Sequence, residues 1–152
     1  MKKILFVCTG NTCRSVLAHH YAALLAAAGK LPLQFTSAGL LAAKDIPQPA
    51  VVADLLKKEG VKDLKHIPVE LTAEIAGEAD LILAMTADHK ARISQLYPAA
   101  AAKTFTLIEY AGFGADDIAD PYGRDALFYF EIFKLIKSAV KASLEKLKKE
   151  VK

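Results

Sequence analysis

Apolar segments alternate with segments of helical spacing along this chain of 152 residues. The run Lys3–Val7 is too apolar to alternate between polar and apolar positions, which predicts a strand that is buried on both faces. Short segments of similar character follow at intervals and are bounded by turn residues. The further predicted strands are Leu33–Ser37, Asp80–Ala84 and Lys103–Ile108.

The segments between these strands favour helices. Ser15–Ala28 is rich in alanine and leucine and stops before Gly29, a residue that commonly ends helices. Asp125–Val151 carries apolar residues three and four positions apart, the signature of an amphipathic helix. The other predicted helices are Pro49–Lys58, a short capped helix at Thr72–Ile75, and Ala87–Leu96, while Ala111–Arg124 is predicted as a loop rich in glycine and aspartate.

Strands that alternate with helices predict a single-domain α/β fold, a four-stranded parallel sheet with helices on both faces in a Rossmann-like three-layer arrangement. Ligands of such sheets bind at the carboxyl ends of the strands, near the point where the strand order reverses. Cys8 follows the first strand at that end, and Asp120 lies in the loop after the fourth strand. We therefore expect both side chains on the same rim of the sheet.

Composition and charge restrict the classes of protein that this chain can represent. Its length suits one domain with a proper core, and no apolar run approaches the about 20 residues of a membrane span. The start MKKILFV ends at a polar glycine loop, which argues against a signal peptide, and two cysteines without an export signal suit a reducing cytoplasm. The segment from Lys134 onward holds seven lysines and two glutamates, which we interpret as the solvated face of a helix and not as a nucleic-acid or membrane site.

The segment ILFVCTGNTCRS carries the candidate chemistry. A strand ends in Cys8, a polar loop with Gly10 follows, and Arg14 and Ser15 stand where a helix is predicted to begin. The backbone N–H groups of such a loop can form an anion site, to which the helix adds the positive end of its dipole. Arg14 can bind two phosphate oxygens with its planar guanidinium. Such a field favours the thiolate form of Cys8, which is the nucleophile.

These residues also carry a resemblance to a known family. CTGNTCRS, Ser37-Ala38-Gly39 as a turn, Asp80–Thr86, and Asp120-Pro121-Tyr122 together resemble the low-molecular-weight protein-tyrosine phosphatases over nearly the whole chain. Within that family the chain is most similar to the bacterial branch that includes protein-arginine phosphatases. The resemblance implies one phosphatase domain over residues 1–152 with the phosphotyrosine phosphatase I-like fold.

The resemblance implies hydrolysis of phosphoarginine or phosphotyrosine through a cysteinyl-phosphate intermediate. Cys8 would be the nucleophile, Arg14 would stabilise the transferred phosphoryl group, and Asp120 would be the general acid and then the general base. No metal or cofactor is required. Partners would be phosphorylated proteins, with inorganic phosphate as product, and the enzyme would be a cytoplasmic monomer. The implied phosphate-binding residues are Thr9, Gly10, Asn11, Thr12, Cys13, Arg14 and Ser15.

Two features bear on the choice of substrate. Threonine at Thr12 matches the protein-arginine phosphatases, whereas tyrosine-directed members usually carry a larger aliphatic residue there. Tyr122 is expected to form a wall of the cleft, but Gly123 stands where a second aromatic is frequent, and Leu40–Pro47 holds no aromatic residue. Thr12 and Tyr122 are therefore the candidate specificity residues.

Other interpretations remain open beside the phosphatase. An arsenate reductase shares a similar first loop, but its thiol relay needs further cysteines, so Cys8 and Cys13 alone would require an external thiol. A non-catalytic phosphate-binding module would have no use for a thiol and an acid together. The two cysteines are candidates for a redox pair. The four histidines, His19, His20, His66 and His89, show no metal-binding pattern and are interpreted as surface or structural, with adjacent His19 and His20 expected on different sides of a helix.

Overall fold

The computed structural model describes residues 1–42 and 44–151, so that one position of the Leu40–Pro47 segment and the last residue of the predicted domain lie outside the described residues. Its centre is a four-stranded sheet in the order β2-β1-β3-β4, and every pairing in it is parallel. This confirms the predicted α/β fold class. The strands are β1 (Lys2–Cys8), β2 (Leu33–Gly39), β3 (Leu81–Ala84) and β4 (Thr104–Thr106).

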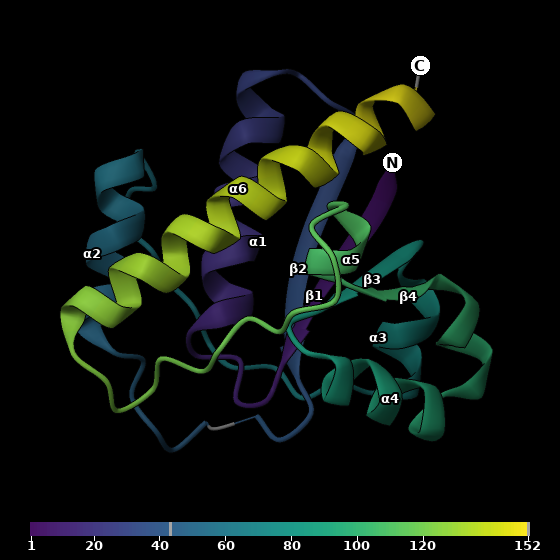
Figure 1. The fold of residues 1–152 in the computed structure, drawn as a ribbon, viewed down its shortest axis with the longest axis horizontal. Helices are drawn as coiled ribbons and strands as arrows, with labels where there is room; N and C mark the ends of the chain where they lie inside the picture. The colour runs from purple at the N-terminus through teal and green to yellow at the C-terminus, as the bar shows by residue number, and fades with distance from the viewer. Residues whose placement is uncertain (43, 152) are drawn as a thin grey trace.

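Helices cover both faces of the sheet (Figure 1). One face packs against α1 (Arg14–Ala28), α2 (Ala50–Glu59) and α6 (Ala126–Glu150), and the other against α3 (Ala73–Glu78) and α4 (Ala87–Leu96). A 3-10 helix at Pro98–Lys103 and the short α5 (Leu107–Tyr110) complete the chain.

Alternation along β1 divides the core into two layers. Ile4 and Phe6 belong to the cluster on the α1 and α6 face, and Leu5 and Val7 belong to the cluster on the α3 and α4 face. All four side chains are buried, as predicted for a strand covered on both faces. Cys8 continues the first set, so the thiol at the end of β1 lies on the side of α1.

Two predicted elements were wrong in part. The segment Lys103–Ile108 was expected to be a strand, but only Thr104–Thr106 pairs with β3. Thr106 and Glu109 form a capping box that starts α5, so the chain turns into a helix before Ile108. Ser37–Gly39, expected as a turn, is the end of β2, with Gly39 in register with Cys8.

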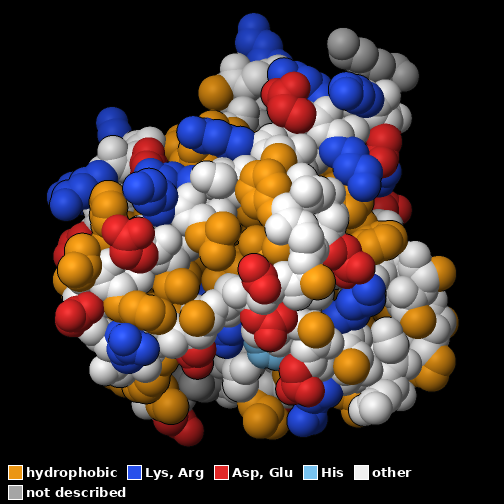
Figure 2. Space-filling model, viewed as in Figure 1, with side chains coloured by type: hydrophobic (Ala, Val, Ile, Leu, Met, Phe, Trp, Pro, Cys, Tyr) orange, Lys and Arg blue, Asp and Glu red, His pale blue; other side chains and the backbone are white. Residues whose placement is uncertain are grey.

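The long C-terminal helix has the predicted amphipathic character. Asp125 caps α6 by accepting from the Phe128 N–H, and the inward positions from Ile132 to Leu147 are buried. The lysines of α6 all lie on its exposed or half-buried side. Figure 2 shows blue side chains over α6 with exposed hydrophobic side chains between them. Within the described residues, no helix has the length and apolar character that a membrane crossing requires.

Candidate active site

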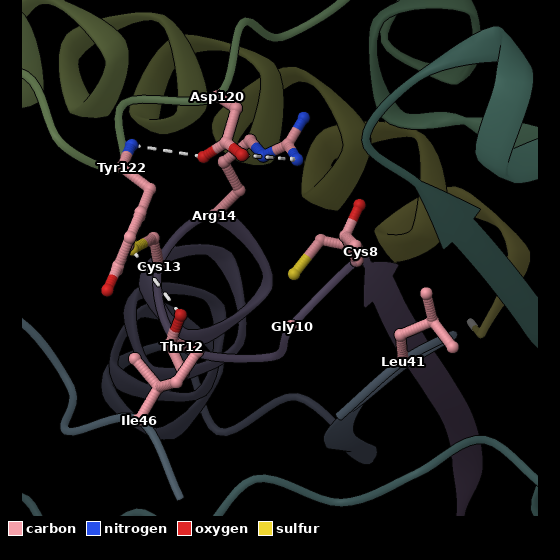
Figure 3. A pocket seen from close by; sticks show the side chains of 10 residues that line it. Cys8, Gly10, Thr12, Cys13, Arg14, Leu41, Ile46, Asp120 and Tyr122 are labelled. Carbon is pink, nitrogen blue, oxygen red and sulfur yellow. Dashed lines mark hydrogen bonds and ion pairs between the residues drawn. The ribbon is translucent and has the colours of Figure 1, made fainter. Parts of the chain in front are cut away.

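A pocket opens where β1 ends and α1 begins (Figure 3). The sheet brings Cys8 and Asp120 to this pocket together, as predicted from their positions after the first and fourth strands. In the order β2-β1-β3-β4, the next strand after β1 lies on one side of it and the two later strands lie on the other side. The strand order therefore reverses at β1, and the pocket lies at this topological switch point. Its lining consists of Cys8, Thr9, Gly10, Thr12, Cys13, Arg14, Leu41, Ile46, Asp120 and Tyr122.

Two predicted loop residues lie behind the pocket and support the thiol. The hydroxyl of Ser15 lies 2.9 Å from Cys8 Sγ. The side-chain amide of Asn11 donates to Ser15 Oγ over 2.8 Å. Since that oxygen accepts from Asn11, the hydroxyl hydrogen of Ser15 is free to point at the sulfur. This arrangement stabilises a thiolate at Cys8.

Asn11 is itself held in a conformation that few residues adopt. Its φ angle is 56°, in the left-handed region, and its side chain is fully buried. Its Oδ1 accepts from the N–H of Val69 over 3.0 Å, and its carbonyl oxygen lies 2.8 Å from Nε2 of His66, which donates. Sequence reasoning missed both supports, because nothing local in the segment 60–70 links it to the first loop.

The N-terminus of α1 is open toward the pocket. Cys13 occupies the N-cap position, its side chain makes no capping hydrogen bond to the backbone of the helix, and the first turn contains no acidic residue. The N-terminal residues of α3, α4 and α6 are capped by Thr72, Thr86 and Asp125 respectively. The first turn of α1 therefore keeps backbone N–H groups and the positive end of its dipole available for an anion.

Arg14 is buried and tied to the loop that carries the acid. Its Nη1 donates to the carbonyl oxygen of Ile118 over 2.8 Å, and its Nη2 lies 3.7 Å from Oδ2 of Asp120. Asp120 Oδ1 accepts from the N–H of Tyr122 over 3.0 Å, which closes a turn around Pro121. Arginine and acid are thus held on the same side of the pocket.

Gly39 allows the end of β2 to approach the first loop. A Cβ at this position would lie 2.5 Å from the carbonyl oxygen of Thr9. The close approach lets the N–H of Leu41 donate to that same oxygen over 2.9 Å. Any larger residue at Gly39 would push the loop outward.

Cys13 differs from Cys8 in its surroundings. Burial raises the pKa of the Cys13 thiol, although contacts with Tyr129 Oη and Thr12 Oγ1, each at 3.6 Å, act in the opposite direction. Burial also raises the pKa of Tyr129. Cys13 is therefore a neutral thiol at physiological pH. Cys8 and Cys13 are both free in the structure.

The outer walls of the pocket hold two aliphatic side chains and one aromatic side chain. Leu41 and Ile46 come from the segment after β2, and Tyr122 comes from the loop before α6 (Figure 3). Tyr122 is 51 % exposed and lines the pocket as expected. Thr12, only 6 % exposed, lies deeper between these walls. The lack of aromatic residues in this segment is evident from the sequence, but the wall positions of Leu41 and Ile46 were not predicted.

The histidines correct one expectation. His19 and His20 were expected on different sides of the helix, but their rings stack with centroids 4.2 Å apart. Successive helical residues diverge by only about 100°, so suitable side-chain rotamers can bring long rings together. His19 also lies 3.0 Å from the hydroxyl of Ser37 and is thus half-buried and structural.

The chain resembles known proteins over nearly all of its length. The sequence profile of the low molecular weight phosphotyrosine protein phosphatases matches residues 3–152. A protein-arginine-phosphatase of Bacillus subtilis is 35% identical over 150 residues, which cover 98% of this chain and 96% of that protein. A protein-arginine-phosphatase of Geobacillus stearothermophilus is 36% identical over 148 residues, 97% of each chain.

A low molecular weight protein-tyrosine-phosphatase Ptp of Acinetobacter johnsonii is 34% identical over 139 residues, which cover 91% of this chain and 93% of that protein. Among solved structures, the YwlE arginine phosphatase from Geobacillus stearothermophilus superposes with a TM-score of 0.89 at 34% identity, over 99% of this chain and 95% of that one. These likenesses agree with the fold and with the motifs that carry the predicted resemblance.

Proposed function

Since the chain belongs to the low molecular weight phosphotyrosine protein phosphatase family, it is a cysteine-based phosphoprotein phosphatase, and we propose that phosphoarginine in proteins is its preferred substrate. The observation that carries this proposal is the joint position of Cys8, Arg14 and Asp120 on one pocket with Thr12 between its walls. We propose one phosphatase domain over the chain.

The proposed first step transfers the phosphoryl group to the enzyme. Cys8 Sγ attacks phosphorus in line with the leaving nitrogen, so that an S–P bond forms as the P–N bond breaks. Asp120, in its protonated form, gives its proton to the leaving guanidine nitrogen. Arg14 and the N–H groups of the loop bind the three remaining phosphoryl oxygens as charge redistributes.

The proposed second step releases phosphate. A water molecule attacks the phosphorus of the intermediate while Asp120, now a carboxylate, takes its proton. The S–P bond breaks and its electron pair returns to sulfur. The thiolate that leaves is stabilised by the hydroxyl of Ser15, which lies 2.9 Å from Cys8 Sγ.

The walls of the pocket support phosphoarginine as the substrate. Leu41 and Ile46 offer aliphatic surface, which suits the methylene stem of an arginine side chain. Thr12 places a short polar side chain where a hydroxyl can interact with a guanidinium. The two relatives of 35% and 36% identity are both named protein-arginine-phosphatase.

Phosphotyrosine is the second candidate substrate. Tyr122 presents an exposed ring at the pocket, and a phenyl group of the substrate could pack against it. Gly123 follows it, so the ring has no adjacent aromatic partner in sequence. A single exposed ring binds a phenyl group less strongly than two rings would, which makes phosphotyrosine the weaker candidate.

A comparison of two substrates tests the proposal. Peptides of identical sequence that carry either phosphoarginine or phosphotyrosine should be hydrolysed with a higher kcat/KM for phosphoarginine. Cys8→Ser should abolish turnover of both peptides and still bind inorganic phosphate, because the loop and Arg14 remain. A higher kcat/KM for phosphotyrosine would overturn the substrate assignment, and full activity of Cys8→Ser would overturn the mechanism.

We also propose the setting in which the enzyme works. Its two cysteines are free thiols, which suits a reducing cytoplasm. The pocket is lined from a single copy of the chain, so a monomer holds the complete set of proposed residues. Phosphate release by the protein at dilutions where light scattering gives the mass of one chain would support this proposal.

A further inference from the structure

One buried histidine contacts the first loop from the far side of the sheet. His89, in the first turn of α4, places Nε2 2.8 Å from the hydroxyl oxygen of Thr9. Thr9 directly follows Cys8 and lines the pocket, and its side chain is exposed. His89 is only 6 % exposed. The contact therefore links a pocket residue to a side chain that was interpreted from the sequence as surface or structural.

Hydrogen bonding assigns the direction of this contact. Within the described part of the chain, Nδ1 of His89 is buried without a partner. An N–H group in that position would be an orphaned donor, which is rare in protein interiors, so the proton belongs on Nε2. Burial and the nearby Arg14 lower the pKa of His89 to about 4, which keeps the ring neutral at physiological pH. The Nε2–H of His89 then donates to Thr9 Oγ1.

This assignment leaves the hydroxyl hydrogen of Thr9 unused. An oxygen that already accepts from His89 can turn its own hydrogen toward another acceptor. Thr9 lines the pocket between Cys8 and Gly10, where phosphoryl oxygens are proposed to bind. With its oxygen accepting from His89, the Thr9 hydroxyl therefore has its hydrogen available for an acceptor in the pocket.

The start of α4 is also bonded to the loop that carries the acid. The N–H of Ala87 donates to Asp117 Oδ1 over 2.8 Å, and the N–H of Ile118 donates to the carbonyl of Met85 over 3.0 Å. Ile118 is in turn the residue whose carbonyl binds Arg14. The start of the first loop is thus joined to the acid loop through α4, by the contacts of His89 and Ala87. The end of the first loop is joined to the acid loop directly, by the bond from Arg14 to Ile118.

We propose that His89 is a positioning residue of the phosphatase reaction, which orients the Thr9 hydroxyl as a donor to a phosphoryl oxygen and fixes the first loop relative to the acid loop. The inference rests on the proposed function, because it assumes that the phosphoryl group binds beside Cys8. It adds to that function a side-chain donor and the group that orients it.

Thr9 variants test the donor without disturbing the core, because this side chain is exposed. Thr9→Val removes the hydroxyl at constant shape, and Thr9→Ser is the matched control that keeps it. Thr9→Val should reduce kcat by roughly tenfold and weaken inhibition by inorganic phosphate by a similar factor, whereas Thr9→Ser should stay within about threefold of the parent. Equal activity of Thr9→Val and the parent would overturn the proposal.

His89 variants test whether the histidine acts through Thr9. His89→Gln keeps an N–H donor at a comparable reach, whereas the shorter amide of His89→Asn falls short, so glutamine should rescue most of the activity that asparagine loses. In the pair His89→Asn with Thr9→Val, the losses should not add, because both remove the same contact. Additive losses, or no rescue by His89→Gln in a variant that unfolds at the parental urea midpoint, would contradict the inference.

The parent enzyme distinguishes this proposal from the proposed function. If the parent hydrolyses neither phosphoarginine nor phosphotyrosine peptides, the function itself has failed. If the parent is active and the Thr9 and His89 variants are as active as the parent, the function stands and the positioning role has failed. If a His89 variant does not fold, the comparison of Thr9→Val with Thr9→Ser decides, because the Thr9 side chain is exposed.

Discussion

Asp120 Oδ2 lies 3.7 Å from Arg14 Nη2, so an ion pair joins the acid loop to the end of the first loop. The two partners differ in environment, because the Arg14 side chain is 5% exposed and that of Asp120 is 55% exposed. The buried arginine is further held by the carbonyl of Ile118, whereas the exposed carboxylate is further held, within the described part of the chain, only by the N–H of Tyr122 at its Oδ1. A substitution at Asp120 should therefore affect proton transfer more than it affects the position of Arg14.

Asp120→Ala and Asp120→Asn should slow substrates with poor leaving groups by about a hundredfold or more, and substrates with activated leaving groups far less. The reason is that only a poor leaving group needs a proton in the transition state. The measurement is kcat over a series of aryl phosphates whose phenols differ in acidity. Asp120→Asn preserves the shape of the side chain and serves as the control, and equal losses across the series would argue against the acid role.

Thr12→Ile should lower phosphoarginine hydrolysis by roughly ten- to a hundredfold and spare or raise phosphotyrosine hydrolysis. Isoleucine removes the hydroxyl beside the leaving nitrogen and adds surface that can pack against a phenyl ring. Competing peptides measured in one mixture would give the ratio directly. Thr12→Ser keeps the hydroxyl and should preserve the preference. If both activities fall together, Thr12 only shapes the loop and phosphotyrosine becomes the better candidate.

Mild peroxide should convert Cys8 and Cys13 into a reversible disulfide. A thiolate oxidises first to the sulfenic acid, and a thiol in the same tight loop can then displace water to form the S–S bond. Cys13, whose pKa is raised by burial, should resist direct oxidation and act as the second thiol. Mass spectrometry after treatment should show the disulfide in the parent and over-oxidised Cys8 in Cys13→Ala. Recovery of only sulfinic or sulfonic Cys8 from the parent would refute the pairing.

Acid should destabilise the fold through its half-buried histidines His19 and His20. Burial lowers the pKa of His19 to about 3 and that of His20 to about 4. In the unfolded chain these rings bind protons near pH 6.5, so the unfolded state takes up more protons as the pH falls below that value. The free energy of unfolding should therefore be highest above about pH 6.5 and should fall toward pH 4.

Urea unfolding measured between pH 7 and pH 4 would test this dependence. Each such ring contributes at most about 1.4 kcal/mol per pH unit to the slope. His20→Phe keeps a flat ring against His19 without a titrating group, so it should make the slope shallower. An unchanged slope in His20→Phe would show that His20 is not one of the groups responsible.

The order of helices and strands could be predicted from the sequence, because the spacing of apolar residues and the turn residues are local signals. Prediction failed where two local signals competed, as at Lys103–Ile108, where β-branched residues favour a strand but Thr106 and Glu109 favour a helix start. It failed more completely for contacts between distant segments. Neither the donation from His66 to Asn11 nor the pairing of Thr9 with His89, 80 residues away, has any signature in sequence spacing.

The pocket residues also divide into those with a local sequence signal and those without one. Cys8, Arg14 and Asp120 could be identified because a short motif and the rule for parallel sheets place them together. Leu41 and Ile46 could not, because an aliphatic residue in a loop carries no chemical signature of its own. Their place at the pocket depends on the close approach of β2 to the first loop, which the absence of a side chain at Gly39 permits.

The open first turn of α1 has one more consequence. Among the described residues no side chain caps this helix, whereas α3, α4 and α6 each obtain a cap from a Thr or Asp side chain. An anion at the pocket would complete the helix during each catalytic cycle and uncap it again on departure. Substrate, intermediate and product would then each take the place of a capping side chain. The thermal stability of the enzyme should therefore rise with the fraction of molecules whose site is occupied.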